Sequence, residues 1–376
     1  MTPKEAYLAL NLLPGIGPIR VRRLLERFEN PQAILTAKRR EILEVQGIGE
    51  EMAELIGDWE NRIDLIEEKR RITEHEISLL TLEDDHYPAA LRTIHDPPFL
   101  LYMKGSLTSA DDAAIGVVGS RRTTHYGRDQ AKKLSFQLAK AGFCIVSGLA
   151  RGIDTAAHEA ARAAGGRTIA ILGSGIGNIY PPENQALADR IAESGAVLSE
   201  FPVLYVPDKQ SFPLRNRIVA GISRGLLVVE APVRSGSLIT ANQALEQGRS
   251  VFAVPGPIDR PTSEGCHRLI QQGATLVCSV QDVIDELGME INSLAFDFLP
   301  ETRESSTPAG EKPKRQLDLS DAETKILAEL TLGDSTIDSL SEATGINAGK
   351  VGATLLQLEL KSLIKQLPGK IFTKQI

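Results

Sequence analysis

Five turns in this 376-residue chain combine glycine, serine and arginine, and each is assigned to the carboxyl end of a predicted β-strand. They are residues 117–127, 147–154, 173–182, 212–217 and 235–240. Glycine lets the backbone approach a ligand closely, and serine hydroxyls and helix N-terminal amides bind phosphate oxygens. Arginine adds a fork of donors for phosphate and a flat face on which a base can stack. The repeated combination predicts an extended ligand that carries several phosphates.

Twelve residues of these turns are the candidate ligand-binding residues: Gly119, Ser120, Arg121, Ser147, Gly148, Arg151, Gly152, Arg215, Asn216, Arg217, Ser235 and Ser237. Ligands of open α/β sheets bind outside the carboxyl ends of the strands. The four arginines of this set are therefore expected to converge on one rim of the sheet.

Seven short apolar runs alternate with helical segments from residue 113 onward. Their sequences are AAIGVVG, FCIVS, RTIAILG, GAVLSEF, GLLVVEA, SVFAVPG and ATLVCS. Near-continuous apolar strands separated by helices are typical of a parallel sheet that is covered on both faces. We therefore expect an α/β fold with an extended Rossmann-like parallel sheet in a domain over residues 71–299.

Residues 1–70 show helical periodicity with Gly/Pro punctuation, and they are expected to form a helix-hairpin-helix or SAM-like domain. Two similar turns, 13–17 and 45–49, each precede a predicted helix. Amides at such a helix start can hold a DNA phosphate. Three arginines follow the first turn, so phosphate binding and a structural role are both open there. Two glutamates follow the second turn, which favours a structural role.

The C-terminal part is expected to be a polar, Pro-rich linker at 300–316 and a winged-helix domain at 317–376. Ser320 and Glu323 have the spacing of a capping box, and helices are expected at about 336–344 and 347–360, followed by a hairpin. The third helix is nearly uncharged, so strong duplex binding is not expected of it. A protein contact or weak DNA binding is at least as consistent with this composition.

Charge is distributed unevenly, although the whole chain has a formal net charge of −7. Residues 1–112 carry 14 Lys/Arg and 21 Asp/Glu, and residues 286–376 carry 10 and 14. Residues 113–285 carry 18 Lys/Arg and 14 Asp/Glu, so the predicted sheet domain is the only basic part. Local rather than total charge determines whether phosphates are attracted.

Other phosphate or catalytic chemistry finds less support. The segment Gly173-Ser-Gly-Ile-Gly177 resembles a dinucleotide-binding motif, but Asn178 replaces the third glycine and the motif is not on the first strand–helix turn. The chain contains no G-x-x-x-x-G-K-[ST] sequence, and its six histidines have no metal-ligand spacing. We therefore expect no cofactor, no metal and no catalysis.

Two polar residues of the helix after the second turn are expected to be structural. His158 is interpreted as a packed or capping side chain rather than a general base. Asp154 is expected to cap this helix or to orient Arg151, because no partner for general-base chemistry is apparent.

The turn sequences closely resemble the DNA-processing protein A (DprA, or Smf) family. The matching segments are VVGSRRTTHYG, SGLARGIDTAAH, GSGIGNIYPPEN, FPLRNRIVAGIS, VVEAPVRSGSLITANQALEQGRSVFAVPGPID and GCHRLIQQGA, in family order. The resemblance implies a Rossmann-type domain that binds and protects single-stranded DNA without catalysis. It also implies a homodimer that interacts with RecA and helps to load it in natural transformation or homologous recombination.

By the same resemblance, Ser120, Arg121 and Arg151 contact DNA. The position of Arg151 is often lysine in the family, and arginine keeps the positive charge. Arg215, Asn216 and Arg217 match an F-P-x-R-N-R motif that can shape the pocket as well as touch DNA. The edge of the sheet formed by residues 226–275 corresponds to the region through which members dimerise.

Two other functions are alternatives to DNA binding. A nucleotide-monophosphate phosphoribohydrolase of the Lonely Guy type is disfavoured, because residues 235–242 lack the catalytic glutamate at the required spacing. A scaffold whose terminal domains bind proteins, with DNA contact secondary, remains the alternative. Three scattered cysteines, no secretory leader and no apolar run of transmembrane length predict a cytoplasmic protein without a membrane partner.

Overall fold

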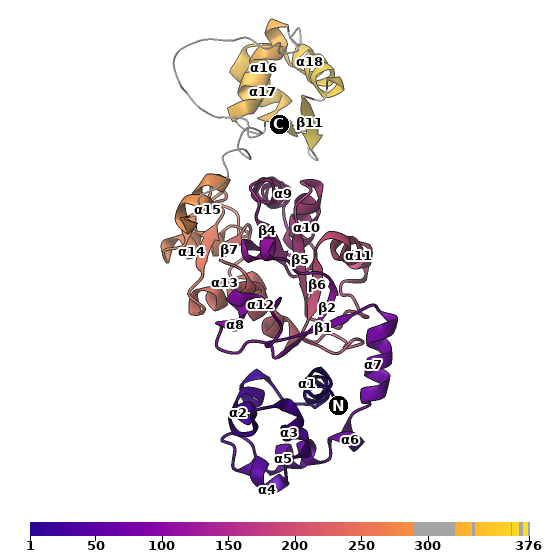
Figure 1. Ribbon diagram of the computed structural model, residues 1–376. Coiled ribbons are helices and arrows are strands. Elements are labelled where there is room, and N and C mark those ends of the chain that lie inside the picture. The colour runs from indigo at the N-terminus through magenta and orange to yellow at the C-terminus, as the bar shows by residue number, and fades with distance from the viewer. Residues whose placement is uncertain (289–319, 333–334, 362, 368–370, 375–376) are drawn as a thin grey trace. The chain divides into compact units, whose positions relative to one another are not determined.

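A computed structural model describes residues 1–288, 320–332, 335–361, 363–367 and 371–374 (Figure 1). Residues 1–300 form one compact unit and residues 301–376 form another. The predicted linker at 300–316 lies outside the described residues. The predicted boundary at residue 70 has no counterpart in this division, since the first helices and the sheet belong to the same unit.

Seven helices occupy the first part of unit 1. They are α1 (Pro3–Leu12), α2 (Pro18–Phe28), α3 (Pro31–Thr36), α4 (Arg39–Leu43), α5 (Glu50–Gly57), α6 (Trp59–Arg62) and α7 (Leu65–Glu74). Proline stands in the first turn of α1, α2 and α3, where its missing N–H costs no intrahelical hydrogen bond. Thr2 and Glu5 form a complete capping box at the start of α1.

The two predicted glycine turns are built alike. Gly15 and Gly47 adopt positive φ angles of 78° and 83°, which an L-residue with a side chain rarely takes. Gly17 and Gly49 then serve as the N-caps of α2 and α5. The repeat of turn and helix explains why the two five-residue sequences are so similar.

A nine-stranded sheet forms the centre of unit 1, in the order β1-β2-β6-β5-β4-β3-β7-β8-β9. Its strands are β1 (Ser78–Thr81), β2 (Leu100–Gly105), β3 (Ala114–Val118), β4 (Cys144–Ser147), β5 (Thr168–Leu172), β6 (Ala196–Ser199), β7 (Gly225–Val228), β8 (Ser250–Ala253) and β9 (Thr275–Leu276). All seven predicted strands are present, and all pair in parallel. The strand order reverses between β3 and β7, which defines a topological switch point.

The edge formed by β1 and β2 was not predicted. β1 pairs antiparallel with β2, and β2 pairs antiparallel with β6. The sheet is therefore mixed rather than wholly parallel. The parallel part has the Rossmann strand order with β6 as an additional strand.

Helices cover both faces of the sheet: α8 (Ala89–Arg92), α9 (His125–Lys140), α10 (Ile153–Ala163), α11 (Gln185–Ser194), α12 (Ser211–Ile222), α13 (Gly236–Glu246), α14 (Glu264–Gln271) and α15 (Val280–Leu287). One buried cluster joins α9, α10 and α15 to β3, β4, β7 and β8. Another joins α12, α13 and α14 to the opposite side of the same strands. Strands with apolar side chains on both faces need helices to cover both faces.

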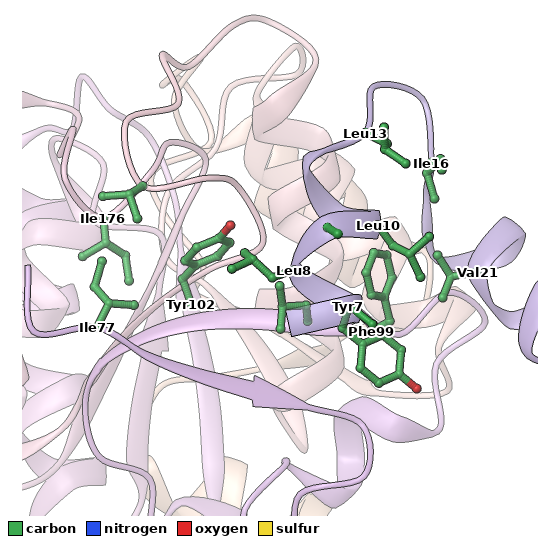
Figure 2. Close-up of a cluster of buried hydrophobic side chains, with 14 of the residues drawn as sticks. Tyr7, Leu8, Leu10, Leu13, Ile16, Val21, Ile77, Phe99, Tyr102 and Ile176 are labelled. Carbon is green, nitrogen blue, oxygen red and sulfur yellow. The ribbon is translucent and has the colours of Figure 1, made fainter. Parts of the chain in front are cut away.

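The N-terminal helices share a buried cluster with the sheet (Figure 2). Tyr7 and Leu8 of α1 are almost fully buried, and the rings of Tyr7 and Phe99 lie 6.0 Å apart. The Tyr7 hydroxyl donates to the Glu83 carboxylate at 2.7 Å. Glu68 of α7 accepts a 2.7 Å bond from the backbone N–H of Val203. The shared core explains why the helices and the sheet form a single unit.

Unit 2 has the winged-helix layout. It contains α16 (Asp321–Leu332), α17 (Ile337–Thr344) and α18 (Ala348–Leu360), with strands β10 (Ser335–Thr336), β11 (Ile364–Leu367) and β12 (Ile371–Lys374). The predicted capping box of Ser320 and Glu323 is formed, and Gly345 ends α17 with a φ of 68°. The predicted hairpin is formed by β11 and β12, while its turn lies outside the described residues. A buried cluster belonging to this unit holds the three helices together.

Candidate nucleic-acid interface

A cleft of about 520 Å³ lies at the switch point, beside the turns that follow β3 and β7. Seven of the twelve candidate residues line it: Gly119, Ser120, Arg121, Arg215, Asn216, Ser235 and Ser237. The same place in other open α/β sheets holds the ligand. The structure therefore brings residues of the first, second, fourth and fifth predicted turns to one cleft, but the fourth, 212–217, is the start of helix α12 rather than a turn.

The Gly-Ser-Arg turn is held by the segment after β7. The Ser120 backbone N–H donates to the Glu230 carbonyl at 2.7 Å. The buried Glu230 carboxylate accepts bonds from the Thr123 hydroxyl at 2.6 Å and from the Thr124 N–H and hydroxyl at 2.9 and 2.8 Å. The Ser120 hydroxyl accepts from the Arg122 N–H at 3.1 Å. Glu230 is thus a positioning residue that sequence reasoning missed, because its partners are distant in the sequence.

Arg121 is exposed at the mouth of this turn and lies over an aromatic ring. Its guanidinium carbon is 4.9 Å from the centroid of Phe212, in the range of a cation–π contact. The Tyr180 ring lies 5.9 Å from the Phe212 ring. Cationic and aromatic groups are therefore adjacent at the cleft, a pairing that suits a phosphate next to a base. Phe212 and Tyr180 stood in the predicted turns but were not among the candidate residues.

Arg151 does not line the cleft and is paired with a carboxylate. Its guanidinium forms a two-point ion pair with Glu183, including a 3.0 Å bond to Oε2, and both side chains are about half exposed. The hydrogen bond to Glu183 is the main cause that raises the pKa of Arg151. A phosphate that binds Arg151 has to compete with Glu183.

Three candidate residues of the second turn, Ser147, Gly148 and Gly152, form its interior. The Ser147 hydroxyl donates to the Val117 carbonyl at 2.6 Å. A side chain at Gly148 would collide with Arg215, and Gly152 has a φ of 81° with the Ser120 carbonyl where a Cβ would stand. These three residues shape the floor of the site and present no side chain to a ligand.

Asp154 fixes the backbone of this turn. Its Oδ2 accepts from the N–H groups of Gly148 and Ala150, each at 3.2 Å. Burial raises the pKa of Asp154, and the charge of Arg215 opposes that shift. Asp154 therefore holds the turn before α10, and both expectations for it are wrong: the N-cap of α10 is Gly152 without a side-chain bond, and Arg151 pairs with Glu183.

Arg215 lines the cleft from a buried position. It is 4% exposed, and its Nη1 donates to the Ile171 carbonyl at 2.6 Å. Burial lowers the pKa of Arg215 to about 10, and the neighbouring Asp154 opposes the shift. Arg215 supplies fixed positive charge beneath the cleft rather than a mobile side chain at its rim.

Arg217 lies away from the cleft, so the expected convergence of four arginines on one rim is not observed. Its Nη2 is 2.6 Å from both carboxylate oxygens of Glu200, and its Nε is 3.2 Å from Asp96. The side chain is 6% exposed. Both acidic partners are contributed by loops outside α12, which is why the motif alone did not reveal this pairing.

The fifth turn presents the start of α13 to the cleft. Ser235 is the N-cap residue, and its hydroxyl accepts from the Ser237 N–H at 3.3 Å. The two hydroxyl oxygens lie 2.6 Å apart. Backbone amides at a helix N-terminus carry partial positive charge, so this end of α13 favours an anion in the cleft.

The third turn is closed to a dinucleotide by its own backbone contacts. Gly175 donates to the Tyr205 carbonyl at 3.0 Å, and Gly177 donates to the Val203 carbonyl at 2.8 Å. A Cβ at Gly175 would meet the carbonyl oxygens of Pro202 and Val203 at 2.1 Å. The glycines permit this close packing, so packing within the protein accounts for the glycine-rich sequence of this turn.

His158 is fully buried, as a packed histidine would be. Its Nδ1 lies 2.7 Å from the Thr168 hydroxyl, which donates its proton to the Ile145 carbonyl at 2.6 Å. The hydroxyl must therefore accept from Nδ1–H. Burial lowers the pKa of His158 to about 3, so the ring is neutral at physiological pH.

The arginines after the first hairpin turn bond to the protein itself. Arg20 donates to the Gly15 carbonyl, and Arg23 donates to the Gln46 carbonyl at 3.1 Å. Arg22 donates to the His95 carbonyl at 2.9 Å. The Arg23 bond ties the two hairpin turns together, and all three bonds favour the structural alternative for the first turn.

Within the described ranges, no three His, Cys, Asp or Glu side chains are grouped so that they could hold a metal ion. None of the helices in the described part of the chain is both long and apolar enough to cross a membrane.

Three family models match successive parts of the chain. Residues 7–56 match the SAM-like helix-hairpin-helix tandem, residues 78–288 match DNA recombination-mediator protein A, and residues 310–370 match the DprA winged helix domain. Protein Smf of Synechocystis is 36% identical over 394 residues, which is 99% of each chain.

Two solved structures are similar to this one. DNA processing protein A from Streptococcus pneumoniae superposes with a TM-score of 0.68 at 40% identity, covering 76% of this chain and 98% of that chain. A structure of DNA processing protein A from Helicobacter pylori, described for its single-stranded DNA binding mode, has a TM-score of 0.51 at 32% identity. It covers 57% of this chain and 97% of that chain. Taken with the family models, these matches show that the chain belongs to the DprA/Smf family of DNA recombination mediators.

Proposed function

We propose that the cleft at the switch point binds single-stranded DNA and that the chain uses this binding to mediate recombination. The observation that carries the proposal is the contact of exposed Arg121 with the Phe212 ring beside the N-terminus of α13. A phosphate can bind the guanidinium and the helix amides while its base stacks on the aromatic ring. The similar protein from Helicobacter pylori, described for its single-stranded DNA binding mode, supports this proposal.

Single strands are favoured over duplex by the position of the aromatic groups. Phe212 and Tyr180 can stack only with bases whose faces are accessible, and base faces in a duplex are covered by their neighbours. Arginine and backbone amides contact phosphates, which carry no sequence information. The binding is therefore expected to show little sequence preference.

The twelve candidate residues divide into three roles in this proposal. Ser120, Arg121, Asn216, Ser235 and Ser237 contact the strand, and Gly119 lets the turn pack closely against Ile153 and the Glu230 carbonyl. Arg151 joins them when a phosphate displaces Glu183. The buried candidates Ser147, Gly148, Gly152, Arg215 and Arg217 shape and charge the site from beneath.

The finer parts of the proposal rest on membership in the family. We infer a non-catalytic, cytoplasmic homodimer that protects incoming DNA and helps to load RecA during transformation or homologous recombination. The sheet domain binds the strand, while the helical and winged-helix parts have accessory roles. Cleavage of nucleotides is the competing activity, and incubation with AMP followed by measurement of free adenine tests it. Release above a buffer control would contradict the non-catalytic assignment.

A gel-shift titration of the full chain with single- and double-stranded oligonucleotides of one sequence tests DNA binding. We expect tighter binding to the single strand, with affinity falling steeply as salt rises because bound counterions are released. Equal affinity for both forms would contradict the proposed single-strand preference. Binding that does not depend on salt would contradict the phosphate contacts.

A further inference from the structure

The outer surface of α9 is basic and almost free of compensating acids. Arg128, Lys132, Lys133 and Lys140 are exposed, and no acidic side chain in the described part of the chain forms an ion pair with them. The one acidic residue of this helix, Asp129, lies 3.9 Å from the Nδ1 of His125. Such a density of unpaired cations costs self-repulsion, which bound phosphates would relieve.

An exposed aromatic ring stands within this basic surface. Phe136 is 39% exposed and lies one helical turn from Lys132 on one side and from Lys140 on the other. The ammonium of Lys140 is 5.8 Å from the Phe136 ring centroid. Cations that alternate with an aromatic ring form the pattern of a single-strand binding platform, where phosphates pair and a base stacks.

The apolar side of α9 already accounts for its packing. Ala131, Leu134 and Leu138 are buried against the sheet, so the fold itself does not require the basic and aromatic side. The neighbouring helices expose few acids, namely Glu159 on α10 and Asp285 and Glu286 on α15. Asp285 accepts a 2.6 Å bond from Gln281. The surface of α9 thus keeps a positive balance among its neighbours.

The basic surface begins where the cleft ends. Arg121 and Arg122 line the cleft, and Thr124, two residues later, caps the start of α9 through a 3.1 Å bond from the Gly127 N–H. The helix then runs from the carboxyl edge of β3 along one face of the sheet towards the start of β4 (Figure 1). Its 16 residues extend for about 24 Å. A strand that leaves the cleft over Arg122 would meet this surface next.

We propose that the outer surface of α9, defined by Arg128, Lys132, Lys133, Phe136 and Lys140, is a second contact segment for the single strand held in the cleft. The inference rests on the proposed function of the cleft and adds the path of the strand outside it. It implies that a strand long enough to reach α9 binds more tightly than one that fills only the cleft. The longer strand also releases more counterions, so its binding has the steeper salt dependence.

The double substitution Lys132→Ala/Lys140→Ala tests this path in the full-length chain. Binding is measured with oligothymidines of about 5 and about 25 nucleotides, lengths that bracket common single-strand site sizes. For the long strand, we expect the affinity to fall about tenfold and the log–log salt slope to decrease by about 1.4, the value for two lost phosphate contacts. The affinity for the short strand should not change.

The matched control is Arg40→Ala/Arg190→Ala, which removes the same charge from exposed positions on α4 and α11. The inference is overturned if the α9 variant matches this control on the long strand. It is also overturned if both lengths lose affinity equally, since the charges would then act on the cleft itself. Failure of the unsubstituted chain to bind either length would instead contradict the proposed function of the cleft.

Discussion

The turn after β3 and the helix α12 each carry an arginine that matches a family motif, yet the two side chains meet opposite environments. Arg121 is exposed, lies over Phe212 and lines the cleft. Arg217 is 6% exposed and is bound to Glu200 and Asp96. The first arginine is available to a ligand, whereas the second has its charge neutralised inside the protein. The sequence motif alone therefore does not show whether an arginine is available to a ligand. The acidic side chains around it in the fold decide this.

Arg217 and Glu200 form a buried pair in which each charge compensates the other. Burial raises the pKa of Glu200, and the charge of Arg217 opposes that rise. Removing one partner of such a pair leaves an uncompensated buried charge, which destabilises proteins strongly. An exposed arginine over an aromatic ring has no such consequence for folding.

The largest expected effect is on folding, from Arg217→Ala. It should lower the free energy of unfolding by about 3–5 kcal/mol, because Glu200 would lose its buried partner. Urea denaturation followed by circular dichroism measures this change. Arg121→Ala is the matched control and should unfold like the unsubstituted chain. Similar destabilisation by both substitutions would remove the distinction between the two arginines.

Phe212→Ala should weaken single-strand binding by about 1–3 kcal/mol, the contribution of one stacked base. Phe212→Tyr keeps an aromatic face and should retain most of the affinity. Fluorescence anisotropy with a labelled oligonucleotide gives both values. Loss of affinity in the tyrosine variant as well would argue that the ring only packs against its neighbours.

The buried His158 also predicts that the free energy of unfolding decreases in acid. The folded pKa of His158 is about 3, against 6.5 for an unperturbed histidine. Below pH 6.5 the unfolded chain gains a proton that the folded chain does not, so stability falls as pH decreases towards 3. His158→Leu should reduce this slope by about 1.4 kcal/mol per pH unit well below pH 6.5, and by about half of that between pH 7 and 6. Denaturant titrations at pH 7, 6 and 5, chosen as roughly neutral to mildly acidic points, compare the slopes. Parallel curves for both proteins would contradict a neutral buried ring.

The smallest expected effect is an increase in affinity. Glu183→Gln removes the charge that competes with phosphate for Arg151, and the attraction within this exposed pair is weakened by water. Single-strand affinity should therefore rise by up to about fivefold at low salt, with a smaller gain at high salt. Glu193→Gln, which removes the exposed acidic partner of the half-buried Arg162, is the control. A decrease in affinity would show that Glu183 supports binding.

The sequence allowed the strand ends and their turns to be located because apolar runs and glycine punctuation are local signals. Residues 117–122 and 235–240 could be placed at one ligand site, since parallel strands bring their carboxyl ends to the same edge. The packed role of His158 also followed from its position on a helix.

What could not be predicted depends on contacts between distant segments. The pairing of Arg217 needs Asp96 from a loop before β2, and the Glu230 bonds to Thr123 and Thr124 cross from β7 to β3. The antiparallel pairing of β1 and β2 is set by tertiary packing, which local propensity does not specify. The core shared by α1 and the sheet also depends on tertiary packing and was not predicted for the same reason.

Single-strand binding by Arg121→Ala/Arg151→Ala tests the proposed site most directly. We expect this full-length variant to lose about a hundredfold in affinity, or about 2.7 kcal/mol, because two charge-assisted phosphate contacts are removed. Its unfolding curve should be unchanged, since both side chains are exposed. The control Arg40→Ala/Arg190→Ala should bind like the unsubstituted chain. A folded Arg121→Ala/Arg151→Ala protein with undiminished affinity would contradict the assignment of the cleft as the DNA-binding site.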